Sequence, residues 1–95
     1  MHAIDGDLLI GGERLKHVHV ELEEEAPQPG SREWILAGHI HLSALQSQQL
    51  EIDRAYRLLL DDGRAGQVVL YRISPDGKPE EVQADFQPKA AAQAG

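Results

Sequence analysis

The sequence predicts an all-β fold, specifically a small antiparallel barrel or sandwich of about six short strands. Apolar and polar residues alternate over residues 16–24, 33–42 and 66–73, as expected for strands with one buried face. Short turn sequences rich in glycine, proline and aspartate separate these segments. A closed barrel is attractive because closure leaves no exposed strand edge.

The first half of the chain contains a short strand followed by a predicted hairpin. Residues 7–10 form the short strand between Asp5-Gly6 and Gly11-Gly12, two pairs that we interpret as turns. Residues 16–25 and 33–43 then form two longer strands, separated by a Pro/Gly loop. Their predicted core faces carry Val18, Val20, Leu22, Trp34, Leu36, Gly38, Ile40 and Leu42.

Residues 43–60 fit either a helix or a strand. As a helix, they would be capped by Ser43 and would end at Gly63. As a strand, residues 50–60 alternate, and Asp61-Asp62-Gly63-Arg64 provides a hairpin turn because glycine readily adopts a positive φ. We therefore predict a strand at 50–60, preceded by a loop or helical turn at 43–49. An α+β fold with one helix near 44–60 is the alternative.

The last third of the chain contains the clearest strand, residues 67–74, which is apolar on both faces at its start. The sequence Pro75-Asp76-Gly77-Lys78 predicts a turn. A final strand at 81–86 would direct Val82, Ala84 and Phe86 inward. Residues 1–87 are thus predicted to form a single β-rich domain, and residues 88–95 a disordered tail.

Composition excludes several classes of function. The 95 residues carry a net charge of −7 with dispersed basic residues and no cysteine. This excludes disulfides and thiolate metal sites, and it argues against nucleic-acid binding. We see no secretory signal and no apolar run long enough to span a membrane, so we expect a cytoplasmic protein without membrane partners. A protein partner or self-association is expected instead.

Four of the five histidines form two His-x-His pairs, at His17 and His19 and at His39 and His41. Side chains at i and i+2 share a face of a strand, so the hairpin would place all four on one face. If His17 faces His41, then His19 faces His39, and a register slip of two residues either way retains one cross-strand pair. Opposed Cβ atoms lie ~5 Å apart. Glu21 continues this row of side chains, and imidazole with carboxylate suits zinc, nickel or copper.

No other residues form a catalytic set. The sequence lacks a Gly-x-Ser-x-Gly motif, and turn geometry explains Asp61 and Asp62. The interior of a barrel this small is filled by side chains, so we expect no enzymatic activity and no cofactor.

The leading interpretation is therefore a non-catalytic protein-interaction or structural module, such as a small accessory subunit or a phage-type assembly component. The alternative is a metal- or small-ligand-binding β-barrel that uses His17, His19, His39 and His41. Exposed histidines are common on the outer face of a sheet, but zinc or nickel is expected to bind them at least weakly.

Overall fold

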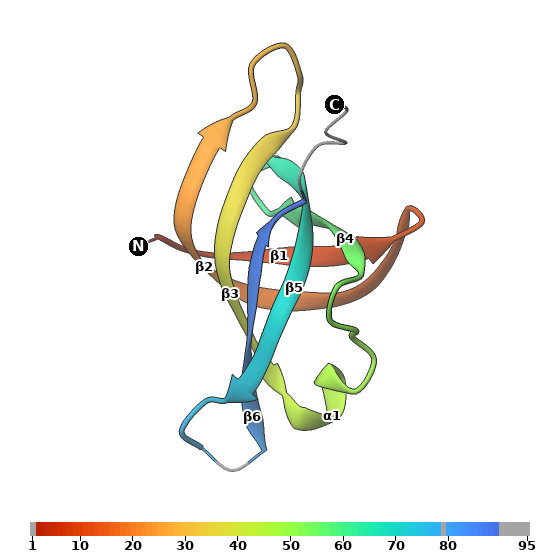
Figure 1. Cartoon of the computed structure of the whole chain (residues 1–95), viewed down its shortest axis with the longest axis vertical. Helices are drawn as coiled ribbons and strands as arrows, with labels where there is room; N and C mark the ends of the chain where they lie inside the picture. Colours follow the sequence, from red (N-terminus) through yellow and green to blue (C-terminus); the bar gives the residue numbers. More distant parts are fainter. Residues whose placement is uncertain (1, 79, 90–95) are drawn as a thin grey trace.

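The computed structural model describes residues 2–78 and 80–89. Within them lie β1 (His2–Ile10), β2 (Glu13–Pro27), β3 (Trp34–Ser43), α1 (Ala44–Ser47), β4 (Ala55–Leu60), β5 (Ala65–Pro75) and β6 (Glu81–Pro88). The strands form a closed antiparallel barrel in the order β1-β2-β3-β6-β5-β4, in which β1 also pairs with β4 (Figure 1). The prediction of a small all-β barrel is confirmed.

The one helix in the described part of the chain is α1, which spans four residues. The alternative of a helix over residues 44–60 is therefore wrong, whereas a helical turn within residues 43–49 is confirmed. Ser43 caps α1, because its hydroxyl accepts a hydrogen bond from the Gln46 amide and the Gln46 side chain accepts one from the Ser43 amide. No helix in the described ranges is long and apolar enough to cross a membrane.

The strand predicted at 50–60 is correct for residues 55–60 and wrong for residues 50–54. Asp53 has a positive φ of 69°, which interrupts an extended backbone. The amide of Asp53 donates to the Leu70 carbonyl, and the Tyr56 hydroxyl accepts a hydrogen bond from the Glu51 amide. These bonds hold residues 50–54 as an ordered connection, in which Leu50 is buried at one end of the barrel.

The turn predicted at Asp5-Gly6 is also wrong, because β1 begins at His2 and runs through both residues. Gly6 pairs with Val18 of β2 and Leu60 of β4. A Cβ atom at Gly6 would lie 2.8 Å from the Leu59 carbonyl oxygen. Here glycine therefore serves the close approach of two strands rather than a turn.

At the other end of the chain, the barrel extends slightly beyond residue 87. Pro88 is the last residue of β6, and the Lys89 amide donates a hydrogen bond to the Gln67 carbonyl at 2.9 Å. Residues 88 and 89, which were predicted to belong to the tail, are therefore part of the barrel or bonded to it. The remainder of the predicted tail, residues 90–95, lies outside the described residues.

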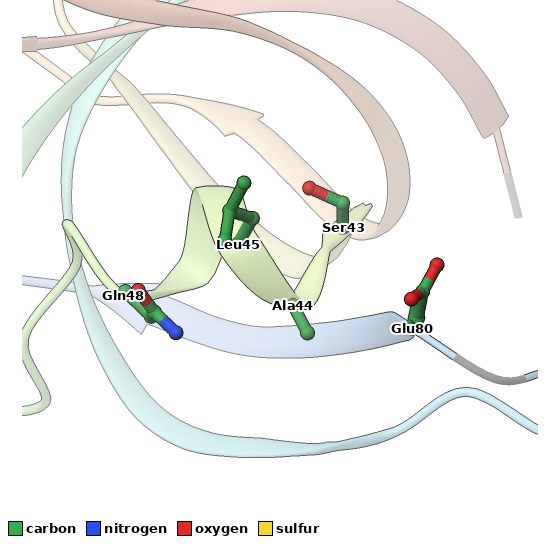
Figure 2. Close-up of a pocket in the computed structure, with 5 residues that line it drawn as sticks. All are labelled: Ser43, Ala44, Leu45, Gln48 and Glu80. Carbon is green, nitrogen blue, oxygen red and sulfur yellow. The ribbon is translucent and has the colours of Figure 1, made fainter.

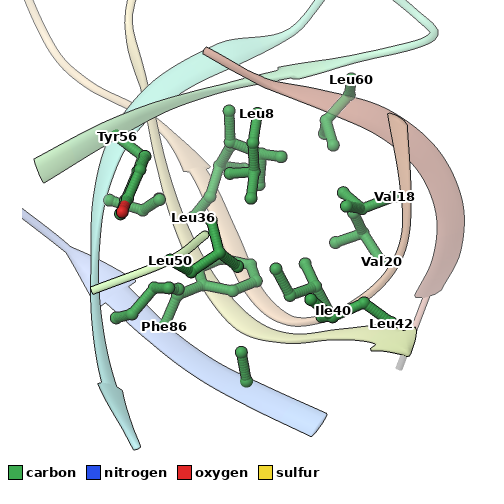
Figure 3. Close-up of a cluster of buried hydrophobic side chains, with 14 of the residues drawn as sticks. Leu8, Val18, Val20, Leu36, Ile40, Leu42, Leu50, Tyr56, Leu60 and Phe86 are labelled. Atoms are coloured by element: carbon green, nitrogen blue, oxygen red, sulfur yellow. The ribbon is translucent and has the colours of Figure 1, made fainter. Parts of the chain in front are cut away.

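Alternating apolar side chains from all six strands fill the barrel interior (Figure 3). The pattern that predicted each strand therefore also determines which of its faces is buried. The buried members of the core are Leu8, Val18, Val20, Leu22, Leu36, Ile40, Leu42, Leu50, Tyr56, Leu58, Leu60, Val68, Leu70, Ala84 and Phe86.

Two hairpins project at opposite ends of the long axis, formed by β2–β3 and by β5–β6 (Figure 1). Trp34, at the start of β3, is partly buried against the core and stacks under the Arg64 guanidinium, whose central carbon lies 5.1 Å from the ring centroid. Arg64 also pairs with Glu25 and Asp62. These contacts anchor the loop end of the β2–β3 hairpin to the β4–β5 turn.

The backbones of β3 and β5 approach closely at Gly66. A Cβ atom added there would overlap the carbonyl oxygen of Trp34. The overlap is with backbone, which has little freedom to move in a closed barrel. Gly66 is therefore required by packing.

We expect Gly66→Ala to lower the free energy of unfolding by about 1–3 kcal/mol, because overpacking forces strands apart. Gln67→Ala, at the exposed neighbouring position, should change it by less than about 0.5 kcal/mol. Urea unfolding of both variants measures the difference. Equal stability of the two variants would show that the barrel tolerates the extra methyl group.

Candidate metal centre

The four histidines of the two His-x-His pairs all lie on the outer face of the barrel. Val18 and Val20, which alternate with them on β2, are buried in the core, as are Ile40 and Leu42 on β3. The shared outer face therefore agrees with the prediction. His17 and His19 are about half exposed, but His39 is buried. His39 is flanked in register by Glu21 of β2 and Asp85 of β6, so it is not an exposed histidine although it lies on the outer face.

The register between β2 and β3 sets which histidines meet. His19 pairs with His41 and Glu21 pairs with His39. Relative to the register in which His17 would face His41, the two strands are shifted by two residues. As predicted for such a shift, one cross-strand histidine pair is retained. The ring centroids of His19 and His41 lie 5.8 Å apart. His17 lies further along β2, where its register partner is Asp7 of β1.

Glu21, His39 and His41 converge on one point. The Nε2 atoms of His39 and His41 lie 2.8 Å and 2.6 Å from the same Glu21 oxygen, Oε2. One potential ligand atom from each residue lies within 4.8 Å of the other two. The two imidazole rings are nearly perpendicular, with centroids 5.0 Å apart. Two nitrogens and one carboxylate oxygen thus face a common position between β2 and β3.

His41 has a carboxylate at each ring nitrogen. Its Nδ1 lies 2.7 Å from Asp76 Oδ2, and its Nε2 contacts Glu21. An ionised carboxylate only accepts hydrogen bonds, so both nitrogens donate. Burial lowers the pKa of His41, but the bonds to Glu21 and Asp76 outweigh burial and raise that pKa above its ordinary value. Hydrogen bonds from His41 and His39 in turn lower the pKa of Glu21.

The other two histidines are each held by an aspartate of β1. His19 Nδ1 lies 2.8 Å from Asp5 Oδ1, and His17 Nδ1 lies 2.8 Å from Asp7 Oδ1. The hydrogen bond to Asp7 raises the pKa of His17, and the hydrogen bond from His19 lowers the pKa of Asp5. The two bonds orient both imidazoles through the same ring nitrogen.

A second, more exposed group lies beside the first. Ligand atoms of Asp5, His17 and Asp61 also fall within 4.8 Å of one another. Asp61 belongs to the β4–β5 turn, where the sequence assigned it to turn geometry alone. All three side chains are exposed, so solvent screens their interactions more strongly than those of Glu21, His39 and His41.

Four aspartates of this face were not identified as site residues from the sequence: Asp5, Asp7, Asp61 and Asp76. Asp5 and Asp76 were interpreted only as turn residues, and Asp7 as the start of a strand. Nothing in the local sequence around these aspartates indicates that they contact histidines. Their contacts with histidines depend on pairing between β1 and β2 and on the position of the β5–β6 turn.

An open hollow of about 320 Å³ lies at α1, and no histidine lines it (Figure 2). Its lining residues are Ser43, Ala44, Leu45, Gln48 and Glu80. Glu80 is the one titratable residue among them, and its carbonyl accepts a hydrogen bond from the Ala44 amide. The hollow therefore offers no grouping of catalytic side chains.

Comparisons with protein families, with curated proteins and with solved structures found no match to this chain. Fold and site together define a small closed β-barrel with a histidine–carboxylate cluster on its outer face.

In metal-free protein, we expect Asp7→Asn to lower the pKa of His17 toward 6.5, its ordinary value. The reason is that the variant removes the carboxylate that favours the imidazolium form. His41, whose carboxylate partners are Glu21 and Asp76, should keep its raised pKa. Histidine ring resonances followed by NMR across the titration give both values. An unchanged midpoint for His17 would contradict the assigned cause.

Proposed function

We propose that this protein is a non-catalytic metal-binding β-barrel module, which holds a divalent transition-metal ion through Glu21, His39 and His41. The convergence of two imidazole Nε2 atoms on one carboxylate oxygen supports the proposal most directly. A cation at this position would replace the protons that these groups now share. The binding energy would come from ligands already held together by the pairing of β2 and β3.

The chemistry of the donors favours zinc, nickel or copper. Imidazole nitrogens suit these three ions, and a single carboxylate is a common companion ligand for zinc. Calcium and magnesium prefer oxygen ligands, and a site with two nitrogens is poorly matched to them.

A carboxylate behind a metal-bound histidine is a further feature of built metal sites. Asp76 provides one here, since it contacts the Nδ1 atom of His41 and leaves Nε2 directed at Glu21. It fixes both the ring orientation and the nitrogen that is available to a metal.

A non-catalytic role is supported by the position of the cluster. The barrel interior is filled with apolar side chains, and the hollow at α1 is lined by none of the three ligands. A catalytic metal would also need a substrate pocket beside it. The side chains around the cluster are instead held in hydrogen bonds to one another.

Wild-type protein should bind zinc, and both Glu21→Gln and His39→Ala should weaken that binding by about tenfold or more, because each removes a ligand. His2→Ala removes an exposed histidine that contacts Glu25 and should leave affinity unchanged. Titration of metal-free protein with zinc in competition with a chromophoric chelator measures all four affinities. If wild type binds no better than Glu21→Gln, the proposed site does not exist.

A second proposed function is a protein-interaction or structural role, exerted through the exposed side chain of Leu45 in α1. Leu45 of α1 is 74% exposed and lines the hollow described above. Burial of this side chain against another molecule would remove apolar surface from water and would favour association. We propose a second copy of this chain as the partner, because self-association needs no other protein.

If Leu45 mediates self-association, wild-type protein should sediment as a mixture of monomer and larger species at high concentration, and Leu45→Gln should sediment closer to monomer. Leu15→Gln makes the same change at a leucine of β2 that is 37% exposed and serves as the matched control. Sedimentation equilibrium over a range of concentrations distinguishes them. A wild type that is monomeric at every concentration would exclude this contact.

A further inference from the structure

We propose that His19 is the fourth protein ligand of this metal site, so that the site is a closed one with three nitrogens and one oxygen. The inference rests on the proposed function, because it concerns the same ion. His19 lies outside the Glu21–His39–His41 group. With four protein ligands the site would have no position left for water, as in structural zinc sites.

His19 is placed by strand pairing. It is the register partner of His41 and lies two residues from Glu21 on the same face of β2. The four ligands then comprise two from each strand at i and i+2, His19 and Glu21 on β2 and His39 and His41 on β3. This two-by-two arrangement is the most compact set that two paired strands offer.

The orientation of the His19 ring agrees with this role. Its Nδ1 is bonded to Asp5, as the Nδ1 of His41 is bonded to Asp76. In both residues a carboxylate thus occupies Nδ1 and leaves Nε2 as the metal-binding atom, the pattern of carboxylate–histidine–zinc sites. Within residues 2–78 and 80–89, no group is hydrogen-bonded to His19 Nε2, whereas Nε2 of His41 is bonded to Glu21.

The ring separations fit a shared ion. Zinc–nitrogen bonds of about 2 Å at tetrahedral angles place the centres of two bound imidazoles roughly 5 to 5.5 Å apart. The observed separations are 5.0 Å for His39 and His41 and 5.8 Å for His19 and His41. The ring nitrogens of His19 do not lie within 4.8 Å of all three other ligands in the metal-free structure, so binding would require the half-exposed ring to move toward His41.

A closed set of four ligands has a consequence for the chemistry. Four-coordinate tetrahedral geometry without an open position is typical of structural zinc, whereas catalytic zinc retains a water. The ion would join β2 to β3 across their register and would thereby stabilise the folded state. It would also favour zinc over ions that require six ligands.

His17 provides an unusually close control. It lies on the same strand and face, is 51% exposed against 54% for His19, and bonds to an aspartate of β1 at the same 2.8 Å. It differs in lying further from β3, beside Asp5, Asp7 and Asp61 rather than opposite His41. A merely electrostatic or structural effect should therefore affect both residues alike.

The test compares His19→Ala and His17→Ala by zinc titration against a chelator and by zinc X-ray absorption, with thermal unfolding of the metal-free forms as a check on folding. We expect His19→Ala to weaken zinc binding by about tenfold or more and His17→Ala to leave it unchanged. The absorption spectrum should count three imidazoles in wild type and in His17→Ala, and two in His19→Ala. Asp5→Asn should weaken binding less than His19→Ala does, and Asp7→Asn should have no effect.

The outcomes separate this inference from the proposed function. If wild type binds zinc with two imidazoles, and His19→Ala and His17→Ala bind equally well, the fourth-ligand assignment is wrong while the Glu21–His39–His41 site stands. If wild type binds no zinc, both fail. Equal losses in both variants would also overturn the assignment, because they would show a general effect of charge on this face.

Discussion

The closed, filled interior of the barrel is the constraint on which the rest of the structure depends. Every strand must direct one face inward, and the inward residues of β2 and β3 are Val18, Val20, Ile40 and Leu42. Side chains alternate along a strand, so the histidines that lie between these inward residues must point to the outer face. The filled interior thus also determines which face of the barrel carries the histidines.

On that outer face, strand pairing builds a network from residues far apart in the chain. Asp5 and Asp7 come from β1, His19 and Glu21 from β2, and His39 and His41 from β3, while Asp76 reaches the network from the β5–β6 turn. Each histidine meets at least one carboxylate. These carboxylates fix the orientation of the imidazoles on this face.

A site carried on two adjacent strands is more rigid than one carried on loops. The β2–β3 hairpin is further fixed near its loop, where Trp34 packs under Arg64 and where Gly66 allows the backbone of β3 to lie close to β5. These contacts restrain the hairpin at the end of β3 that is distant in sequence from His39 and His41.

Local patterns determined much of this protein. Alternation at 16–24, 33–42 and 66–73 was sufficient to place strands and their buried faces, and the even period of a strand was sufficient to put four histidines on one side. Alternation does not reveal a positive φ, so it extended the predicted strand over residues 50–54. The Asp-Gly pair at residues 5 and 6 suggested a turn, but the glycine is there because two strands approach closely. Only the tertiary structure decided the register that pairs His19 with His41 and brings Glu21 to His39. That register depends on a bulge between Leu22 and Glu24 and on closure through β1 and β4, which are interactions between distant residues that no local pattern encodes.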